Sequence, residues 1–313
     1  MIITLLASLF VFVQLNCENL FDCSHDEGKN DTEFLPDGSY RWTRTRYWQK
    51  LNRTAQTLLS CAHTEEQFIP DMALLCEVEN DTVMRDLTRR SLLRGAHYEY
   101  VMTDSPDERG IDVALVYSPL SFKLLSHHSI RIPTVSGMRP TRDMLYVKGV
   151  AAGGDTLHVV GVHFPSKRGG EQHSRPFREQ AARQLCMTVD SICAASPDAR
   201  IIVAGDFNMY CGEKAMKTLA THGLTDVSAK ARGSRGAKGT YRYHGRWGSL
   251  DHVLVSDALL PAHDSCYIND APFLTIDDEK YGGIQPRRNY MGPAYKNGFS
   301  DHLPLIATFK MGD

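Results

Sequence analysis

The stretches Asp71–Asn80 (DMALLCEVEN) and Ala199–Asn208 (ARIIVAGDFN) share one pattern, a short and continuous apolar run that ends in an acid. A run that is apolar at every position is typical of a strand buried on both faces. Glu77 stands at the end of the first run and Asp206 at the end of the second. The pattern therefore predicts buried strands whose carboxyl ends are polar.

Further strand-like and helix-like segments lie on both sides of these two stretches. The expected strands are Leu9–Leu15, Tyr98–Met102, Ile111–Ser118, Met144–Ala152, Thr156–Phe164, Ser249–Asp257 and Leu303–Phe309. The expected helices are Thr43–Ala62, Thr82–Gly95 (ended by Gly95) and Ser174–Ala195 (opened by Ser174). Residues 261–298, rich in Pro, Gly and Tyr, read as a long loop. Strands interleaved with three helices predict an α/β layered domain, and strands that follow one another without a helix favour two sheets.

Composition places the chain among ordinary globular proteins. Of its 313 residues 42% are hydrophobic and 23% are charged, and no boundary favours two domains, so we expect a single domain over residues 1–313. The net charge of -2 argues against nucleic-acid binding by bulk charge, although a local basic patch could follow phosphates. The eight cysteines form no CxxC pair, and we expect most of them to be reduced and structural.

The N-terminal stretch MIITLLASLFVFVQL, residues 1–15, has two readings. It has the apolar length of a signal-peptide core, but no Lys or Arg precedes the run and no A-x-A site follows it. Alternatively, Leu9–Leu15 is the first buried strand. The run is too short to favour a transmembrane span. Localisation, cytoplasmic or exported, is therefore left open.

Polar side chains gather at the ends of the expected strands. They are Asn16, Glu18, Glu77, His163, Asp206, Asn208, Asp251, Asp301 and His302. Such groups can converge on one edge of a pair of sheets, and carboxylate and amide oxygens are the ligands that Mg²⁺ or Mn²⁺ prefers. Zinc spacings, a GxSxG elbow and a Walker A loop are absent from the sequence, which disfavours a zinc enzyme, a serine hydrolase and a P-loop NTPase.

At these residues the sequence resembles the endonuclease/exonuclease/phosphatase superfamily of metal-dependent phosphoesterases, which have the DNase I-like fold. The matching pieces are NCENLFD, LLCEVEN, VVGVHFPSKRGG, VAGDFNM, GSLDHVLVS and SDHLPL, in the order in which the family has them. The resemblance implies a four-layer α/β sandwich, with two mixed β-sheets flanked by helices and the site at one edge. It leaves the substrate undetermined.

The resemblance also implies a role for each motif residue. Glu77, Asn16, Glu18 and Asp301 match metal-side positions, Glu18 less securely than Glu77. Asp206 matches the residue that activates the attacking water, Asn208 and His163 match phosphate-binding positions, and Asp251 matches the acid that orients His302. Arg142, Lys167 and Arg168 are candidate ligands of substrate phosphate. We expect Glu79 and His252 to be structural, the latter because it points to the face opposite Asp251.

We therefore expect a Mg²⁺-dependent hydrolase of phosphate esters, with Mn²⁺ as an alternative ion, most simply a phosphodiesterase that acts on DNA or RNA. Within the enzyme class the alternatives are a phosphatase, a phospholipid-headgroup (sphingomyelinase-like) hydrolase and an inositol-phosphate hydrolase. A catalytically inactive binding protein of the same fold is the alternative from another class. The aromatic and basic residues of the late loop, Arg287, Arg288, Tyr290 and Tyr295, are candidates for base stacking. No stable protein partner is implied, and we expect a monomer.

Overall fold

Two six-stranded mixed sheets form the body of the protein, whose computed structural model describes residues 8–62 and 69–312. The order in the first sheet is β13 (His263–Ile268), β18 (Leu305–Met311), β1 (Ser8–Leu20), β2 (Met72–Val78), β4 (Asp112–Tyr117), β3 (Glu99–Met102). The order in the second is β5 (Phe122–Ile130), β6 (Met144–Ala151), β7 (Thr156–His163), β8 (Arg200–Asp206), β12 (Asp251–Ser256), β9 (Leu224–Asp226). β1 pairs with β2, and β7 with β8, in parallel, while the remaining neighbours are antiparallel.

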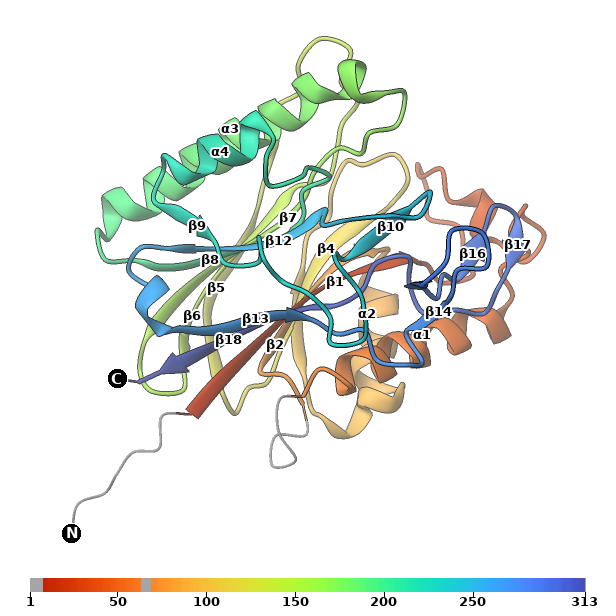
Figure 1. Ribbon diagram of the computed structural model, residues 1–313, viewed down its shortest axis with the longest axis horizontal. Coiled ribbons are helices and arrows are strands. Elements are labelled where there is room, and N and C mark those ends of the chain that lie inside the picture. The colour runs from red at the N-terminus through yellow and green to blue at the C-terminus, as the bar shows by residue number, and fades with distance from the viewer. Residues whose placement is uncertain (1–7, 63–68, 313) are drawn as a thin grey trace.

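Helices cover the outer face of each sheet, so the molecule has four layers (Figure 1). The first sheet carries α1 (Arg44–Leu59) and α2 (Asp81–Arg89), whose buried faces pack on one side of β1 and β2. The second sheet carries α3 (Glu171–Ala195) and α4 (Lys214–Ala220), which pack on β7 and β8. The expected α/β four-layer sandwich is thereby confirmed.

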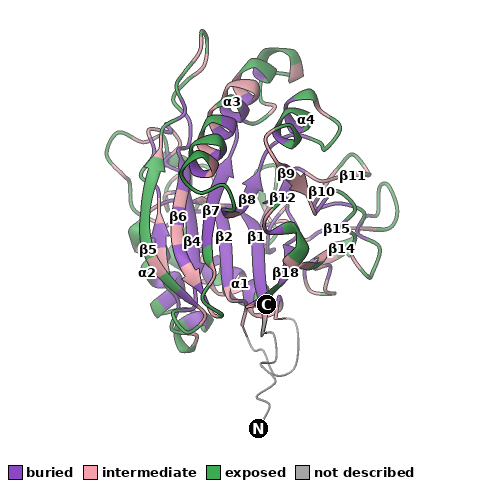
Figure 2. Cartoon of the chain, turned by 90° about the vertical axis from the view of Figure 1, so that its left-hand side faces the viewer, coloured by how far each residue is buried: buried purple, intermediate pink, exposed green. Residues whose placement is uncertain are grey.

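The inner faces of the sheets meet in a common apolar core. The central strands of the first sheet pack against β7, β8 and β12 of the second, and Figure 2 shows these strands buried while β5 stays exposed at one edge. The sheets approach each other closely at Gly161, where an added Cβ would lie 2.5 Å from Leu74 Cδ1. Because core packing leaves so little space, the edges of the two sheets are held rigidly side by side.

Several element boundaries differ from those expected. The first strand extends from Ser8 to Leu20 rather than ending at Leu15, and α3 begins at Glu171 rather than Ser174. The helix expected to end at Gly95 is α2 followed by a separate 3₁₀ turn over Leu92–Gly95. The fourth helix, α4, was not expected, since seven residues give too little periodicity to recognise.

The segment 261–298 is not a simple loop. It contains β13, which completes an edge of the first sheet, and two small hairpins, β14 (Thr275–Asp277) with β15 (Ile284–Pro286) and β16 (Tyr290–Met291) with β17 (Ala294–Tyr295). A third hairpin, β10 (Tyr241–Tyr243) with β11 (Arg246–Gly248), precedes it. These hairpins lie beyond the sandwich at the same end of the molecule (Figure 1).

Three further expectations concern the N-terminal stretch, the cysteines and membrane-spanning helices. Of the N-terminal stretch, residues 1–7 lie outside the described residues, while Ser8–Leu15 belongs to β1, between β18 and β2. All eight cysteines are free. Among the described residues no helix combines the length and apolar character needed to cross a membrane.

Candidate active site

The polar residues that end the expected strands come together at one edge of the two sheets. β1, β2, β7 and β8 reach this edge with their carboxyl ends, and β12 begins there because it runs antiparallel to β8. Gly205 allows the close passage of the strands just before Asp206, since a Cβ at Gly205 would lie 1.8 Å from Val162 O. The pairing of the central strands therefore places side chains from distant segments in one site.

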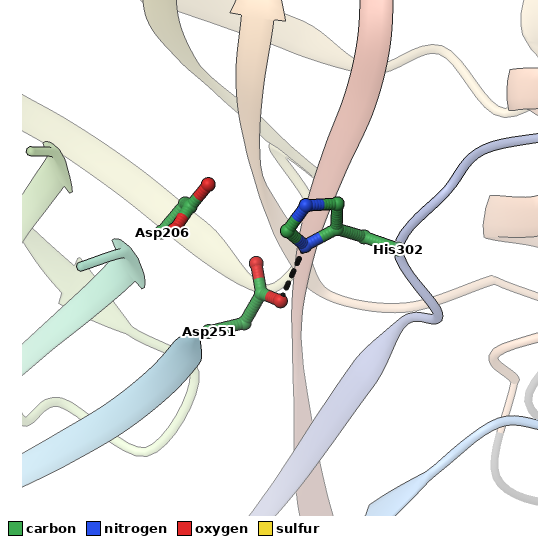
Figure 3. Close-up of side chains that lie close together, drawn as sticks. All are labelled: Asp206, Asp251 and His302. Carbon is green, nitrogen blue, oxygen red and sulfur yellow. Dashed lines mark hydrogen bonds and ion pairs between the residues drawn. The ribbon is translucent and has the colours of Figure 1, made fainter. Parts of the chain in front are cut away.

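His302 and Asp251 form a buried ion pair at the centre of this edge (Figure 3). His302 Nδ1 lies 2.6 Å from Asp251 Oδ2, and both side chains are almost fully buried. Burial by itself disfavours the charged imidazole, but the charge and hydrogen bond of Asp251 outweigh it and raise the pKa of His302 well above its ordinary value. His302 is therefore a cation at neutral pH.

Two further side chains donate hydrogen bonds to Asp251. Gln14 Nε2 donates to Oδ1 at 2.9 Å, and Thr240 Oγ1 donates to Oδ2 at 2.5 Å. Three hydrogen bonds, one of them from a charged partner, fix the orientation of this carboxylate. Asp251 is thus built to hold His302 in one position.

Asp206 lies beside this pair with different partners. Its Oδ1 accepts the backbone N–H of Asn208 at 2.8 Å, and its Oδ2 accepts Asn16 Nδ2 at 3.1 Å. Burial, followed by the negative charge of Asp251, raises the pKa of Asp206 to about 7. A carboxylate with a pKa near neutrality is a competent general base.

Glu77 is the acid best placed to hold a metal ion. Its side chain keeps 14% of its surface exposed, and one backbone donor, Asn19 N at 2.9 Å, binds its Oε2. Its Oε1 faces His163 Nε2 at 3.8 Å, which is beyond hydrogen-bonding distance. Glu77 therefore presents a hard oxygen toward the site, as Mg²⁺ or Mn²⁺ requires.

A second set of potential ligands is the cluster of Asp206, Asp251 and His302, whose ligand atoms lie within 4.8 Å of one another. Metal binding requires a neutral imidazole, whereas His302 is held in its charged form by Asp251. The oxygens of Asp251 are already occupied by three donors. The cluster could therefore act in acid–base chemistry, while Glu77 could hold a metal ion.

The other metal-side acids are engaged by the protein itself. Both oxygens of Glu18 accept backbone N–H groups, from Asn289 at 2.7 Å and Tyr290 at 3.1 Å. Burial and the nearby charge of Asp301 raise the pKa of Glu18 to about 7. Glu18 thus anchors the β16–β17 hairpin, and its role at a metal ion stays a prediction.

Asp301 has a strong cationic partner. Arg288 donates to Asp301 Oδ2 at 2.6 Å. Although burial opposes ionisation, the charges on His302 and Arg288 lower the pKa of Asp301. The fully buried Lys50 of α1 donates to Phe299 O at 2.5 Å, and its charge also acts on Asp301. These three cations offset the excess of carboxylates at the edge.

Four residues at this edge have left-handed backbone. They are Glu18, Asn19, Glu77 and Asn208, with φ between 51° and 61°. Non-glycine residues seldom adopt this conformation, and it persists where the surrounding structure enforces it, often at functional sites. Glu77 adopts it where the β1–β2 and β2–β4 registers shift, which breaks the regular alternation of side chains at the end of β2.

His163 and Asn208 also lie beside Asp206. His163 Nε2 is 3.8 Å from Asp206 Oδ2, and its Nδ1 is buried without a hydrogen-bond partner among the described residues. Burial, with the charges of Arg142 and Arg109, lowers the pKa of His163 well below its ordinary value. His163 is therefore a neutral hydrogen-bonding group, while Asn208 Nδ2 donates to Phe164 O at 3.0 Å.

The three proposed phosphate ligands separate into two groups. Arg142 is buried, donates to Phe164 O at 2.7 Å and pairs with Asp107 at 3.2 Å. Arg142 and Arg168 line the same cavity of about 410 Å³, together with Arg109 and Arg139. Two acids also line this cavity, and they pair with two of its arginines, Asp107 with Arg142 and Glu108 with Arg139. The lining keeps an excess of positive charge, which suits an anionic group.

Lys167 does not join them. Its Nζ pairs with Glu213 at 2.8 Å and Glu171 at 3.2 Å, and it lies over the ring of Tyr210. These contacts tie Lys167 to α3 and to the residues that precede α4. In this arrangement the charge of Lys167 is balanced by two carboxylates, and its role as a phosphate ligand stays a prediction.

Several site residues were not expected from the sequence. They are Gln14, Lys50, Arg109, Thr240, Tyr241 and Arg288 in its role as the partner of Asp301. Tyr241 belongs to the small β10 strand, yet it pairs with His302 through an isolated bridge. Gln14 was detectable, since it is a polar residue within an otherwise apolar strand.

The two residues expected to be structural are buried away from these groups. His252 lies 2.9 Å from Asp226 on the other face of β12 and contacts Met209 O. Glu79 accepts the backbone N–H of Asp22 at 2.7 Å. Their contacts agree with roles in folding rather than in chemistry.

The two-sheet sandwich and its polar edge define a protein of the DNase I-like fold. A sequence model of the Endonuclease/Exonuclease/phosphatase family matches residues 11–311, so the chain belongs to this family. No protein of curated function matches it by sequence.

Solved structures share the fold at low sequence identity. A family protein from Bacteroides thetaiotaomicron superposes with a TM-score of 0.63 at 15% identity, covering 97% of this chain and 98% of that one. The human Nocturnin catalytic domain with a bound sulfate anion gives 0.58 at 18%, covering 96% and 94%. TDP2 of D. rerio, complexed with a single-strand DNA product, gives 0.55 at 18%, covering 96% and 99%.

Proposed function

We propose that the protein is a Mg²⁺- or Mn²⁺-dependent phosphodiesterase that acts as a nuclease. The observation that carries the proposal is that the surroundings of two neighbouring groups suit one as a hydrogen-bond donor and the other as a proton acceptor. His302 is held as a cation by Asp251, while Asp206 beside them has a pKa of about 7 and can accept a proton. Acid and base groups whose pKa values are pushed apart by their surroundings are typical of hydrolytic sites.

In the proposed reaction Asp206 takes a proton from the attacking water as the water oxygen bonds to phosphorus and the P–O ester bond opposite it breaks. The departing alcohol oxygen takes up a proton from the solvent. Asn16 and the backbone of Asn208 orient the carboxylate for this step. The imidazolium of His302 donates a hydrogen bond to a phosphoryl oxygen, and it does not swing away because Asp251 holds its Nδ1. Such preorganised donors stabilise the charge that develops on the phosphoryl oxygens.

A divalent ion held by Glu77 would supply positive charge and Lewis acidity to the phosphoryl group. The neutral His163 and the amide of Asn208 would contact another phosphate oxygen beside it. Arg142 and Arg168 line the adjoining cavity and would hold a neighbouring anionic group of the substrate. A substrate with more than one phosphate fits this arrangement, which favours a nucleic acid over a simple monoester.

The structural neighbours support a nucleic-acid substrate only through the fold, since each is under 20% identical. The D. rerio TDP2 structure contains a single-strand DNA product. The four-arginine cavity is this chain's own feature in support of a polyanionic substrate.

A nicking assay on supercoiled plasmid and a cleavage assay on labelled single-stranded oligonucleotides, each with Mg²⁺ or Mn²⁺ and with chelator, test the proposal. Sphingomyelin, inositol phosphates and simple monoesters are assayed in parallel. We expect metal-dependent cleavage of nucleic acid. Turnover confined to a lipid headgroup, an inositol phosphate or a monoester would identify one of those hydrolases instead, and no turnover of any panel member would favour a binding protein.

A further inference from the structure

A row of aromatic side chains leads from the catalytic histidine to the surface. Tyr241, the first residue of β10, pairs with His302 through a bridge, and their ring centroids lie 4.9 Å apart. The guanidinium of Arg288 lies 5.9 Å from the centre of the Tyr241 ring. Because side chains alternate along a strand, Tyr243 lies on the same face of β10 as Tyr241, about 7 Å farther out. β10 thus links the reaction centre to the exposed tip of its hairpin.

Three rings stack at that tip and remain exposed, although Lys280 Nζ lies 5.0 Å from the centre of the Tyr281 ring. The rings of Tyr243 and His244 are nearly parallel, with centroids 4.1 Å apart, and the ring of Tyr281 continues the series at 6.2 Å from His244. Tyr243 is 58% exposed and Tyr281 is 45% exposed. Aromatic rings usually contribute to folding by being buried, so an exposed stack contributes little to the core and is available to a ligand.

The late-loop tyrosines singled out from the sequence have a different role. Tyr290 packs against Tyr40 and Tyr295, with centroids 4.6 Å and 5.3 Å away, and lies near Trp42. The guanidinium of Arg46 covers the ring of Tyr295 at 4.2 Å. These tyrosines join the hairpin β16–β17 to α1 and its preceding loop, which leaves the Tyr243–His244–Tyr281 stack as the candidate for binding planar groups.

The stack borders a cavity of about 630 Å³ that adjoins the active site through Arg288. Five of its lining side chains are basic and three are acidic. A volume of this size accommodates a ligand as large as a nucleotide, and the excess of positive charge suits a backbone of phosphates. The cavity therefore combines planar apolar surface with basic groups.

The two hairpins that carry the stack are fixed to each other. Arg242 donates to Gly282 O at 2.7 Å and to Ile284 O, and it pairs with Asp278 at 3.4 Å. Its guanidinium also lies 5.5 Å from the ring of Trp247. Since these bonds join β10 to the β14–β15 hairpin, Tyr243 and Tyr281 keep their relative position before any ligand binds.

We propose that the surface formed by Tyr243, His244 and Tyr281 binds unpaired bases of a single-stranded nucleic acid whose scissile phosphate lies at His302. The inference rests on the proposed nuclease function and specifies its substrate. Bases can stack on side chains only when they are free of a duplex. An inositol phosphate has no planar ring to place there. A quaternary ammonium headgroup binds in a cage of aromatic rings, whereas these rings are nearly parallel, which favours a planar nucleobase.

Binding without turnover tests this inference separately from the nuclease function. A fluorescent single-stranded 12-mer of mixed sequence is titrated with Asp206→Asn protein in Mg²⁺, and anisotropy reports the Kd. Base stacking on one aromatic side chain contributes about 1–3 kcal/mol, so adding Tyr243→Ala or Tyr281→Ala should raise the Kd roughly 5- to 150-fold. Tyr243→Trp keeps a stacking ring and should bind within about threefold of the Asp206→Asn parent.

The controls separate stacking from misfolding and from charge. Leu120→Ala removes another exposed apolar side chain, 94% exposed on the loop before β5, and should leave the Kd unchanged. Duplex of the same sequence should bind more weakly and lose little affinity in the alanine variants. Equal single-strand affinity in the parent, Tyr243→Ala and Tyr281→Ala proteins would overturn the inference, as would equal losses for duplex and single strand. Displacement of the 12-mer by an inositol phosphate at equal concentration would also overturn it.

The outcomes distinguish this inference from the broader proposal. Ring-dependent binding of single strands by a protein that fails to cleave any nucleic acid would refute the nuclease function and leave the binding surface intact. Cleavage by wild-type protein together with ring-independent binding would refute the surface alone.

Discussion

Asp206 at the end of β8 stands directly opposite Asp251 at the start of β12 in the antiparallel register of the second sheet. Two buried carboxylates in this position repel each other, and their partners decide which one keeps its charge. Asp251 is bound by Gln14, Thr240 and the His302 cation, whereas Asp206 receives two neutral amide donors. Burial, followed by the negative charge of Asp251, raises the pKa of Asp206 to about 7.

Replacing Asp206 by Asn should remove the general base while leaving the fold intact. General-base catalysis contributes about 10²- to 10⁴-fold, so we expect kcat on a cleaved oligonucleotide to fall by at least about 100-fold. Asn keeps an oxygen for the backbone N–H of Asn208, and it removes the repulsion with Asp251. The Tm should therefore stay within a few degrees of wild type, as thermal unfolding would show.

His302→Ala should cause a loss of similar size through a different group, the donor to the phosphoryl oxygen. The matched control is His252→Ala, which removes a buried histidine from the other face of β12. It should reduce stability more than turnover per folded molecule. Wild-type rates in either Asp206→Asn or His302→Ala would contradict the assigned chemistry.

The Asp251→Asn variant should move the pH profile toward acid. Activity requires Asp206 ionised and His302 protonated, so the wild-type rate should rise as pH increases through about 7 and fall at higher pH when His302 loses its proton. Removing the charge of Asp251 lowers both pKa values, because that charge disfavours ionised Asp206 and favours protonated His302. Profiles of kcat/KM from pH 5 to 10 should show both limbs at lower pH.

Asp226→Asn is the control for that shift. Asp226 holds His252 at 2.9 Å just as Asp251 holds His302, but outside the site. Its profile should coincide with that of wild type. A profile that stays in place in Asp251→Asn would mean that His302 does not titrate in the observed range.

The residues at strand ends were the most predictable part of the site. Glu77, Asp206 and Asp251 follow or begin apolar runs that can be read locally, and the runs themselves predicted the layered sheets. Their convergence at one edge follows from strand direction, which the family resemblance supplied. Because these features depend on local pattern and topology, they can be predicted from the sequence and the family resemblance.

The residues that bind and position those side chains could not be predicted in the same way. Thr240 and Gln14 bind Asp251 from segments 11 and 237 positions away in sequence, and nothing local marks either residue as its partner. Lys167 was predicted to bind phosphate from its motif, and its contacts with Glu171 of α3 and with Glu213, which precedes α4, could not be predicted from that motif. β13 escaped detection because HDSCYI carries little apolar alternation for an edge strand.

The metal position can be tested by ligand-induced stabilisation. A ligand that binds only the folded state raises its stability by about 2.7 kcal/mol at 100 times Kd, so saturating Mn²⁺ should raise the Tm of wild-type protein by several degrees. Glu77→Gln removes the exposed carboxylate and should abolish most of this increase. Differential scanning fluorimetry across a Mn²⁺ titration measures both proteins.

Two variants distinguish between the two candidate metal sites, Glu77 and the Asp206–Asp251–His302 cluster. Glu79→Gln, two residues farther along the chain and bound to Asp22 N, should keep the Mn²⁺ response of wild type. Asp251→Asn should also keep the Mn²⁺ response, since three protein donors already bind the oxygens of Asp251. Loss of the response in Asp251→Asn with retention in Glu77→Gln would instead place the ion in the Asp206–Asp251–His302 cluster.

Glu79 should make stability fall as pH rises. Burial, with the charge of Asp22, raises the pKa of Glu79 to about 9 from the ordinary value of 4.5. Between these two pH values the folded state binds more protons than the unfolded state, so its free energy of unfolding decreases with pH.

Glu79→Gln has no charge to bury and still offers an oxygen to Asp22 N. The variant should match wild type near pH 4.5 and become more stable by about 1 kcal/mol per pH unit above it, as urea denaturation at several pH values would measure. Glu99→Gln, which removes a carboxylate that is 48% exposed and pairs with Arg89, should show no such trend. Equal midpoints for Glu79→Gln and wild type at pH 8 would mean that the folded protein holds Glu79 in its ionised form.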